Sequence, residues 1–494
     1  MIGSIKSNFF LEMQERHPFM EPLVGLFADS GIYLLGAALV GAGNFILVPL
    51  YTRYLTPSQF GLYTLLDLAI LIAVTLSTLR LEVAFLKWFG EGPRGYAVLS
   101  TTLITSGLCG AVAGGLFALF LQSNLAQAWN IAVAPSIALL LLPLILCENL
   151  QMIFLAHLRV QRRAQAFSVC AVIRLLVTIL ASLQFVVATH QALTGVFLGR
   201  LAGDAATLLL LIFLSRTTEW RRPSVALLRP MLSFSLPLIW SGLAVMLMDG
   251  AGRYFLLRYG SMEEVGIYGA AAKISSLFPL LVTQPFGVAW GGMLFRIVKM
   301  KGARETYSRI FSYVLLGSQV AALLLSMCAS RFVAVLGNKT YEAAISVLPL
   351  VFLTRAVAIL EYPASTGIYL SGRTGWFAAI YSAGLITTLA LCSGLVPLYG
   401  MYGAAFGWLA GWLVTASLML AIGQRYYALR LEWKFLALPV LWWTLFLAGQ
   451  YAYSGALLQF SWVAKFTLAL VVVLGGASLC VRDFRNAIAE EAAK

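Results

Sequence analysis

Apolar runs, each about 20 residues long, recur along the chain from Gly31 almost to Val481, with short polar connections between them. A run of that length crosses the hydrocarbon core of a bilayer as an α-helix, in which the backbone groups bond to one another and need no water. About 14 such runs follow one another. The pattern predicts an all-α, polytopic integral membrane protein with about 14 transmembrane helices.

One segment between two apolar runs occurs twice. RYLTPSQFGLY begins at Arg53 and RYGSMEEVGIY begins at Arg258, which is an offset of 205 residues. Four identities in eleven positions can arise by chance in so biased a sequence, but both copies lie between two runs, and the same offset aligns Asn44 with Asp249. The repeat predicts two pseudo-symmetric lobes of six helices in parallel orientation, related by an axis along the membrane normal. The site is expected between the lobes, and two extra C-terminal helices follow them.

Each copy of the repeat also predicts how the returning helix begins. Thr56 with Gln59, and Ser261 with Glu264, fit the capping box, in which the two side chains satisfy each other's backbone N–H groups. Pro57 suits the first helical position, where no hydrogen bond is lost. The repeated segment is therefore expected to form a turn and the start of a helix.

Two further pairs of repeated positions predict helix packing and depth. Gly61 and Gly266 permit close approach of a neighbouring helix, because they carry no side chain. Tyr63 and Tyr268 suit the aromatic belt, where amphipathic rings lie at the membrane–water interface.

Composition supports the membrane assignment. Hydrophobic residues make up 61% of the 494 residues, charged residues make up 11%, and the mean hydropathy is +0.88, which excludes a water-soluble domain. The net charge of +14 does not indicate nucleic acid, because the positions of the cations follow the membrane. With a cytoplasmic N-terminus, 23 Lys and Arg lie in inside segments and four lie outside, at Arg53, Arg258, Arg331 and Lys339. The positive-inside rule then places both termini in the cytoplasm.

These patterns divide the chain into segments. The first 27 residues carry charges and no long apolar core, which argues against a cleavable signal peptide. We expect a cytoplasmic leader at 1–27, an N-lobe of six helices at 28–215, a cytoplasmic linker at 216–232, a C-lobe of six helices at 233–422, two extra helices at 423–481 and a cytoplasmic tail at 482–494.

Residue types that carry enzymatic chemistry form no pattern. The six cysteines lie inside apolar runs and the three histidines are dispersed, so neither a disulfide framework nor a metal site is expected. The sequence holds no phosphate-binding loop, nucleophile elbow or HExxH motif, and no connection is long enough for a soluble catalytic domain. We expect a protein that is not an enzyme and that uses no cofactor.

Charged residues inside the apolar runs are the strongest functional signal. Seven cations and six acids lie within predicted spans, namely Arg80, Arg174, Arg200, Arg253, Lys273, Arg355 and Lys465, and Asp67, Glu82, Glu148, Asp204, Asp249 and Glu361. Each of them costs roughly 2.5 to 3.5 kcal/mol at the bilayer centre on insertion scales, so they cannot all face lipid. They are expected to face one another or water.

Two pairs of these residues are four apart on one helix, which places each pair on one face. For Arg200 and Asp204 the favoured interpretation is an internal ion pair that fixes packing. For Asp249 and Arg253 the favoured interpretation is a binding role, because their helix borders the predicted cleft. Lys273, on the next helix, is the first choice for a contact with an anion.

Several cations with little opposing charge on the same faces suit an anionic ligand such as a pyrophosphate, which arginine can grip with two N–H groups. The candidate substrate-binding residues are Lys273, Arg253, Arg80, Arg174, Arg355 and Arg200. The candidates for ion pairing, or for coupling transport to a gradient, are Asp249, Asp67, Glu148, Asp204 and Glu361. Snorkelling to the inner surface is the alternative for Arg80 and Glu82, and Lys465 is expected to be an interface anchor.

Several segments resemble a known family. NFILVPLYTRYLTPSQFGLYTLLDL resembles the opening of the Wzx-type polysaccharide-transport flippases for lipid-linked oligosaccharides, within the multidrug/oligosaccharidyl-lipid/polysaccharide exporter (MOP) superfamily. YGSMEEVGIYGAAAKIS is similar to the family's second-half counterpart, and AVLGNKTYEAAISVLPL and VPLYGMYGAAFGWLAG resemble later segments. The resemblance covers residues 28 to 425.

The resemblance implies two six-helix lobes that form a V, a cationic central cavity and alternating access. The implied function is the translocation of undecaprenyl-pyrophosphate-linked repeat units from the inner to the outer leaflet of the bacterial inner membrane. The implied partners are that glycan and membrane lipid, with a polysaccharide polymerase and a chain-length regulator as candidates. The two extra helices resemble those of related peptidoglycan-precursor flippases.

Three alternatives stay open at this point. A cation-coupled multidrug exporter and a lipid II flippase both keep the fold and change the cargo. A polytopic polysaccharide polymerase is disfavoured, because it needs catalytic groups on a substantial outer loop and the predicted outer connections are short.

Overall fold

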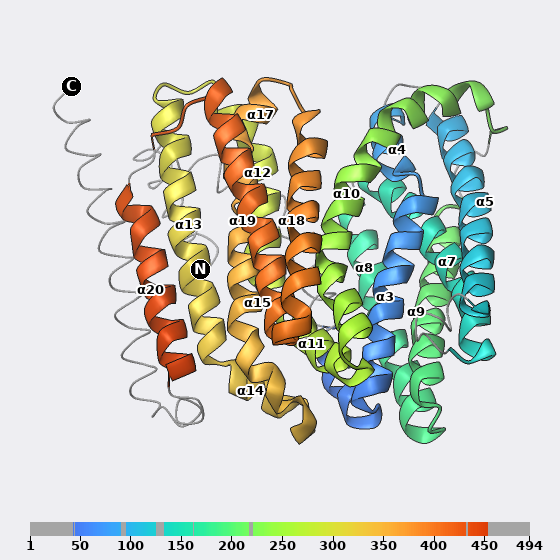
Figure 1. Cartoon of the computed structure of the whole chain (residues 1–494). Helices are drawn as coiled ribbons and strands as arrows, with labels where there is room; N and C mark the ends of the chain where they lie inside the picture. The colour runs from blue at the N-terminus through green and yellow to red at the C-terminus, as the bar shows by residue number, and fades with distance from the viewer. Residues whose placement is uncertain are drawn as a thin grey trace, which may run out of the picture.

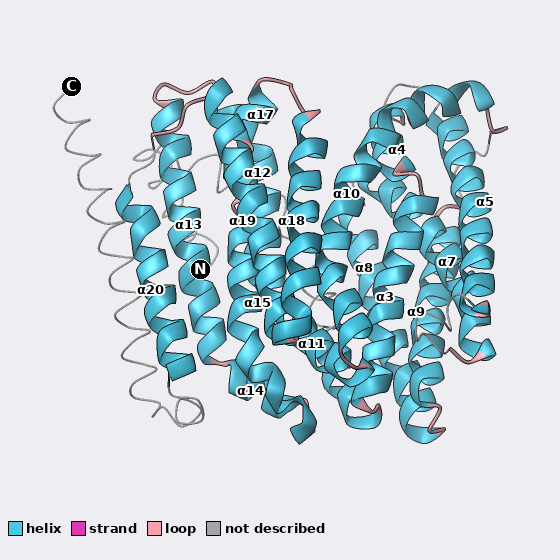
Figure 2. Ribbon diagram, in the orientation of Figure 1, coloured by secondary structure: helices cyan, strands magenta, loops and turns pink. Residues whose placement is uncertain are grey.

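The computed structural model of the chain describes residues 43, 45–89, 95–124, 133–161, 163–216, 221–430 and 433–452. Within these residues the chain forms helices joined by short connections, and no strand occurs among them (Figures 1 and 2). Eleven helical stretches of the described chain are long and apolar enough to cross a membrane. The predicted all-α membrane fold is therefore confirmed. The count of 14 stays a prediction, because parts of the first and last predicted helices lie outside the described residues.

The N-lobe lies on the right in Figure 1. After a helical segment at 45–54, its elements are α3 (Pro57–Ser77), α4 (Leu81–Trp88), α5 (Gly95–Leu121), α7 (Pro135–Val160), α8 (Ala164–Ser182), η1 (Leu183–Ala188) and α9 (Ala192–Leu214). Apolar side chains of α4, α5 and α7 form a core inside this lobe, with Phe85, Leu99 and Ile153 fully buried. Burial of these side chains holds the helices together around the charged residues described below.

The C-lobe lies on the left in Figure 1. Its elements are α10 (Val225–Tyr259), α11 (Met262–Ser275), η2 (Pro279–Thr283), α12 (Gln284–Ile297), α13 (Ala303–Met327), α14 (Ala329–Val335), η3 (Lys339–Ala343), α15 (Ala344–Ala358), α16 (Glu361–Ala364), α17 (Thr366–Leu370), α18 (Trp376–Tyr399) and α19 (Met401–Tyr426). One extra helix follows, α20 (Trp433–Ala452), which packs on α13. There Trp443 Nε1 donates a hydrogen bond to Gln319 Oε1 at 2.9 Å.

Helix α10 contacts both lobes. Near its beginning, the Phe234 ring meets the Trp88 ring of α4 edge-to-face, with the ring centroids 5.4 Å apart. Further along, Trp240 Nε1 donates a hydrogen bond to Ser382 Oγ of α18 at 2.7 Å. Figure 1 shows the resulting diagonal course of α10 between the lobes.

The repeated segment begins helix α3 as the sequence predicts. Thr56 Oγ1 accepts from the Gln59 backbone N–H at 3.2 Å, and Gln59 Oε1 accepts from the Thr56 N–H at 3.0 Å. Pro57 is the first helical residue. In the second copy Ser261 Oγ accepts from the Glu264 N–H at 3.2 Å. The capping box is therefore confirmed in α3, and its first hydrogen bond is confirmed in α11.

The two copies of the repeat pack against each other. A Cβ atom added to Gly61 would clash with the Met262 carbonyl oxygen, and one added to Gly266 would clash with the Pro57 carbonyl oxygen. Gly61 lies near Gly266, and Thr64, further along α3, lies near Gly269, further along α11. The two helices therefore run parallel. The predicted close packing at these glycines is confirmed, and the partner of each glycine helix is the other copy.

The prediction of an aromatic belt at the two repeat tyrosines is wrong. Tyr268 is 2% exposed and lies in the C-lobe core. Tyr63 packs on Tyr51 and Phe197, with ring centroids 5.4 and 6.1 Å apart. The reason is that each ring packs inside its own lobe, Tyr63 against N-lobe rings and Tyr268 in the C-lobe core.

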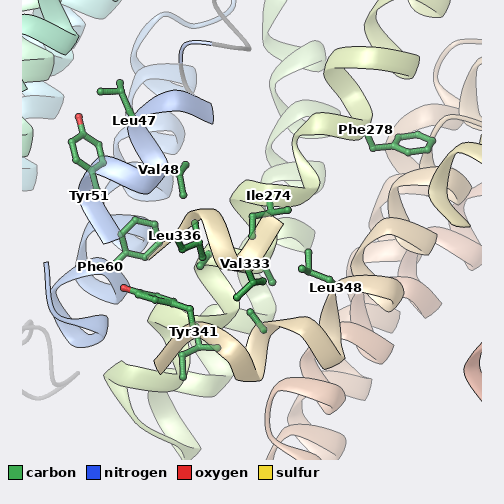
Figure 3. Packing of buried hydrophobic residues seen from close by; sticks show 14 of the residues in the cluster. Leu47, Val48, Tyr51, Phe60, Ile274, Phe278, Val333, Leu336, Tyr341 and Leu348 are labelled. Atoms are coloured by element: carbon green, nitrogen blue, oxygen red, sulfur yellow. The ribbon is translucent and has the colours of Figure 1, made fainter. Parts of the chain in front are cut away.

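An apolar cluster joins the lobes from the end where α3 and α11 begin to the last turn of α11. Figure 3 shows Leu47, Val48, Tyr51 and Phe60 of the N-lobe with Ile274, Val333, Leu336, Tyr341 and Leu348 of the C-lobe. The Phe60 and Tyr341 rings meet edge-to-face with centroids 6.0 Å apart. Thr52 Oγ1 donates a hydrogen bond to the Leu336 carbonyl oxygen at 3.1 Å. These contacts close the lobe interface at this end.

Candidate functional site

Charged side chains from both lobes converge where the lobes meet. Asp67 of α3 accepts from Arg200 of α9, with Nη1 and Oδ1 2.7 Å apart. Lys273 of α11 donates to the other oxygen of Asp67, with Nζ and Oδ2 2.5 Å apart. Arg200 also donates to Glu148 of α7, whose Oε1 lies 2.5 Å from Nη2 and 3.0 Å from Nε. Four helices thus contribute one continuous set of charge-assisted hydrogen bonds.

Arg174 of α8 extends this set. Its Nη2 lies 3.3 Å from Glu148 Oε1, and its Nε lies 2.5 Å from Asp204 Oδ1. Asp204 is fully buried, and its backbone carbonyl oxygen accepts from Gln151 Nε2 at 2.8 Å. We name these residues the central network, which consists of Asp67, Glu148, Arg174, Arg200, Asp204 and Lys273.

The ion pair expected between Arg200 and Asp204 on α9 is not formed. Arg200 pairs with Asp67 and Glu148, and Asp204 pairs with Arg174. The i,i+4 spacing brings two side chains to one helix face, but it does not decide between that partner and one on another helix. Here the acids of neighbouring helices are closer partners, so the charges link helices to each other.

A second group of charges lies in the C-lobe. Asp249 Oδ1 is 3.6 Å from Arg355 Nη2, and Asp249 Oδ2 is 3.8 Å from Arg253 Nη2. Arg355 Nε donates to Ser275 Oγ at 3.4 Å, and its guanidinium carbon lies 4.7 Å from the Trp408 ring centroid. We name these five residues the C-lobe cluster. Both ion pairs exceed hydrogen-bond distance, so the cluster is looser than the central network.

The two groups meet across the lobe interface. Arg253 is 6% exposed, and its Nη1 donates to the Thr64 carbonyl oxygen of α3 at 3.3 Å. The contact between Lys273 and Asp67 crosses the same interface. Asp249 and Arg253, for which the sequence favours a binding role over an internal ion pair, lie 3.8 Å apart beside this crossing point.

The charges of the site are nearly balanced. Five cations, namely Arg174, Arg200, Arg253, Lys273 and Arg355, contact four acids, namely Asp67, Glu148, Asp204 and Asp249. The expectation of little opposing charge is therefore corrected. Glu148 and Asp204 lie on α7 and α9, which are not the helices that the sequence predicts at the cleft. The sequence does not predict the orientation of these two side chains.

Three uncharged residues belong to the site and were missed by the sequence reasoning. The Tyr63 ring centroid lies 5.4 Å from Lys273 Nζ, and Ser275 and Trp408 contact Arg355. Tyr63 lies four residues before Asp67 on α3, which is a usable signal, because i and i+4 share a face. No local pattern marks Trp408, because α19 is apolar on all sides.

Most of the charged side chains of the site are only partly buried. Four of its cations, Arg174, Arg200, Lys273 and Arg355, have side-chain exposures between 20% and 37%. The apolar cluster of Figure 3 packs beside these charges at the lobe interface.

Three candidate residues lie apart from the site or outside the described chain. Arg80 pairs with Glu82 at 3.5 Å beyond the end of α3, where Leu79 and Arg80 are both left-handed, with φ of 53° and 54°. Glu361 accepts a hydrogen bond from the Tyr381 hydroxyl at 2.9 Å, away from both charged groups. Lys465 lies outside the described residues, as does Asn44, the predicted repeat partner of Asp249.

The donor types decide what this arrangement can bind. Arginine N–H groups bind phosphoryl or carboxylate oxygens strongly, because the hydrogen bonds are charge-assisted. Within the described ranges, no three His, Cys, Asp or Glu side chains are placed to hold a metal ion together. The arrangement therefore suits an anionic group, and its carboxylates can exchange protons or bind a cation.

Solved structures of membrane transporters have the same fold. The lipid II flippase MurJ in an inward closed conformation matches with a TM-score of 0.71 and 11% identity, over 93% of this chain and 99% of that one. An inward-facing multidrug resistance MATE family transporter of the MOP superfamily matches with a TM-score of 0.64 and 14% identity, over 80% and 94%. A mutant of the Vibrio cholerae MATE transporter VcmN matches with a TM-score of 0.61 and 13% identity, over 82% and 97%.

Sequence comparison gives the family. No curated protein matches the chain. Residues 27–298, more than half of the chain, match the family model described as polysaccharide biosynthesis protein. The resemblance seen in the repeated segment is thereby confirmed, together with a multi-pass membrane location. The chain belongs to the polysaccharide biosynthesis protein family and has the fold of the MOP superfamily transporters.

Proposed function

We propose that this protein is a flippase that translocates undecaprenyl-pyrophosphate-linked oligosaccharide units across the bacterial inner membrane. The units feed the synthesis of a surface polysaccharide such as O-antigen, capsule or exopolysaccharide. The family description and the likeness in fold to a solved lipid II flippase support a lipid-linked cargo. In this proposal both termini are cytoplasmic, and a polysaccharide polymerase and a chain-length regulator act on the product.

The C-lobe cluster carries the proposal. Arg253 and Arg355 share the carboxylate of Asp249 at 3.8 and 3.6 Å. Charge-assisted hydrogen bonds are shorter, at about 2.7 to 2.9 Å, so both guanidinium groups keep donors for another anion. Two arginine forks match the oxygens of a pyrophosphate, and exclusion of bulk water strengthens the attraction. We therefore assign the pyrophosphate contacts to Arg253 and Arg355.

The central network has a positioning role in this proposal. Lys273, the first choice from the sequence, is held by Asp67 at 2.5 Å. Its ammonium has three N–H donors, so a bound anion shares Lys273 with Asp67 and weakens a contact between the lobes. A ligand shifts a conformational equilibrium by its different affinity for the two states. An anion that draws Lys273 from Asp67 therefore favours separation of the lobes at the closed end.

The closed end fits loading from the inner leaflet. The distribution of Lys and Arg assigns the beginnings of α3 and α11 to the outer side. The apolar cluster lies at that end. A cargo made in the cytoplasm then reaches the site from the inner side, and alternating access needs the cluster to open afterwards.

The decisive experiment measures lipid-linked oligosaccharide in a deletion strain. The strain is complemented at equal protein levels with wild type, Arg253→Ala, Arg355→Ala or the control Arg258→Ala, which changes an exposed arginine at the end of α10. We expect unpolymerised lipid-linked units to accumulate in the deletion strain. Wild type and the control should clear them, and the two cluster variants should not.

The same strains separate the alternatives. A cation-coupled multidrug exporter is the alternative that the four carboxylates of the site favour, because carboxylates can bind a cationic drug. That function predicts unchanged lipid-linked oligosaccharide and raised sensitivity to cationic drugs in the deletion strain. A lipid II flippase predicts that lipid II accumulates instead. Either result rejects the proposed cargo and leaves the fold assignment intact.

A further inference from the structure

A series of buried hydrogen bonds joins the extra helix α20 to the helix that carries Arg355. Trp443 Nε1 of α20 donates to Gln319 Oε1 of α13 at 2.9 Å, and Gln319 Nε2 donates to the Ala356 carbonyl oxygen of α15 at 3.3 Å. Ser318 Oγ donates to the same carbonyl oxygen at 3.2 Å. Figure 1 shows α13 between α20 and α15. Because Ala356 directly follows Arg355, the series of bonds ends at the turn that holds this arginine.

The donors and acceptors of this series allow one orientation of the Gln319 amide. The Trp443 indole N–H can only donate, and the Ala356 carbonyl oxygen can only accept. Gln319 must therefore turn its oxygen toward the first and its nitrogen toward the second. The side chains of Ser318, Gln319 and Trp443 are 2%, 3% and 4% exposed. Since a buried polar group without a partner costs free energy, Trp443 holds the Gln319 amide in this orientation.

The Ala356 carbonyl oxygen takes these donors because of the way in which α15 ends. In a regular α-helix the Leu360 N–H would donate to it, but that N–H donates to the Val357 carbonyl oxygen at 3.1 Å. Carbonyl groups near the end of a helix often take side-chain partners instead. Removal of the Gln319 amide favours the regular bond from Leu360 to Ala356. That change rewinds the turn that follows Arg355.

The position of this turn decides where the Arg355 guanidinium group lies. Its side-chain contacts are long, with Nε 3.4 Å from Ser275 Oγ and Nη2 3.6 Å from Asp249 Oδ1. Charge-assisted hydrogen bonds that hold a guanidinium group firmly are about 2.7 to 2.9 Å long. The contact with the Trp408 ring covers one face of the group and fixes no N–H direction. The backbone of α15 is therefore the main constraint on the Arg355 donors.

We propose that Gln319 is a positioning residue for Arg355, and that α20 controls anion binding through the Trp443 hydrogen bond. The inference rests on the proposed function, because it adds a control to one of the two assigned pyrophosphate contacts. Gln319 acts through the backbone of α15 and does not touch the anion. A displacement of α20 from α13 breaks the Trp443 bond and frees the amide. Arg355 then loses its alignment with Arg253, and the anion is held less tightly.

The first test compares affinities for inorganic pyrophosphate by titration calorimetry on the purified full chain. We expect Gln319→Leu to weaken binding about tenfold and Trp443→Phe to weaken it by less, and the double variant should match Gln319→Leu. Both changes act through one amide, so additive losses in the double variant would overturn the inference. The control Trp442→Phe changes the neighbouring buried tryptophan of α20 and should leave the affinity unchanged.

A second test follows the position of Arg355 in the absence of the anion. Phenylglyoxal modifies arginine side chains, and mass spectrometry of the peptides gives the rate at each arginine. We expect faster modification of Arg355 in Gln319→Leu and Trp443→Phe, with an unchanged rate at Arg309, which lies on α13 itself. Equal acceleration at both arginines would show general loosening of the C-lobe and would reject a positioning role.

The two tests distinguish failure of this inference from failure of the proposed function. If wild type does not bind pyrophosphate but Arg355 reacts faster in both variants, the positioning role stands and the pyrophosphate contacts are rejected. If wild type and both variants bind pyrophosphate equally and the Arg355 rate is unchanged, the inference is overturned and the proposed function stands. Trp443→Phe keeps an aromatic ring in the buried position, so it carries both tests if Gln319→Leu does not fold.

Discussion

Asp249 lies between two guanidinium groups and reaches hydrogen-bond distance to neither. Its oxygens are 3.6 Å from Arg355 Nη2 and 3.8 Å from Arg253 Nη2, and its side chain is 28% exposed. At about 4 Å in a partly solvated site, opposite charges attract by up to about 4 kcal/mol before screening by water. Asp249 therefore competes with any anion for the same two arginines.

Substitution of this acid should strengthen anion binding. We expect Asp249→Asn to bind inorganic pyrophosphate about tenfold more tightly, or about 1.4 kcal/mol, because the amide keeps the shape and removes the competing charge. Titration calorimetry on the purified protein measures the effect. The control Glu263→Gln changes an exposed acid at the start of α11 and should leave the affinity unchanged. Equal or weaker binding by Asp249→Asn would argue against the assigned contacts.

At this scale the sequence predicts which residues are charged inside the membrane, but not which of them pair. The cost of a charge in lipid is enough to predict that Arg200 and Asp204 face inward. Their actual partners, on α3, α7 and α8, depend on how those helices are rotated, and a sequence pattern on one helix does not contain that rotation. The same limit explains why Trp408 was missed.

At the scale of elements, the glycines of the repeat fix how closely α3 and α11 approach. A Cβ atom at Gly266 would clash with the Pro57 carbonyl oxygen, which is backbone and cannot rotate away. We expect Gly266→Ala to destabilise the folded protein by about 1 to 3 kcal/mol, because the two helices must separate. The midpoint of thermal unfolding in detergent measures the loss.

Gly242 supplies the matched control. It lies within α10, and a Cβ atom there meets nothing within 4 Å. Gly242→Ala should therefore leave stability unchanged or raise it by up to about 1 kcal/mol, as alanine favours a helix. Equal unfolding midpoints for Gly266→Ala and wild type would show that α3 and α11 do not pack as described.

Helix starts were more predictable than helix interruptions. The capping box of Thr56 and Gln59 is a local pattern with a local cause, so it was found without the fold. The turn at Glu361 has one local signal, Pro363, which lacks a backbone N–H and disfavours a continuous helix. The left-handed residues Leu79 and Arg80 have no such pattern, so the sequence does not predict them.

At the scale of the whole molecule, the apolar cluster of Figure 3 joins the two lobes, and the proposed function assigns it to the outer side. Transport requires this closure to open, so a smaller cluster should open more often. We expect the pair of substitutions Phe60→Ala and Tyr341→Ala to raise labelling of a cysteine introduced by Tyr63→Cys. The reagent is a membrane-impermeant maleimide added from outside, in a background without the native cysteines.

A core substitution elsewhere controls for general loosening. Phe85→Ala removes a ring of similar size from the separate N-lobe core, and it should leave the labelling rate unchanged. Equal labelling in all three proteins would contradict closure by the cluster. Labelling from the inner side alone would reverse the assigned orientation.

The repeat in the sequence predicts the two lobes, but it does not predict how the lobes pack against each other. Lobe pairing depends on contacts such as Phe60 with Tyr341, whose members are 281 residues apart (341 − 60) and share no motif. A contact of this kind leaves no pattern within either segment, so the sequence does not reveal it.

The contact between the two repeats has the form of a dimer interface. Gly61 meets Met262, and Gly266 meets Pro57. At the offset of 205 residues, Gly266 is the counterpart of Gly61 and Met262 is the counterpart of Pro57. The two contacts are therefore the same contact made in both directions. Such reciprocity is the mark of a two-fold, isologous association between identical subunits. Within one polypeptide, the two copies thus meet as identical subunits meet across a two-fold axis.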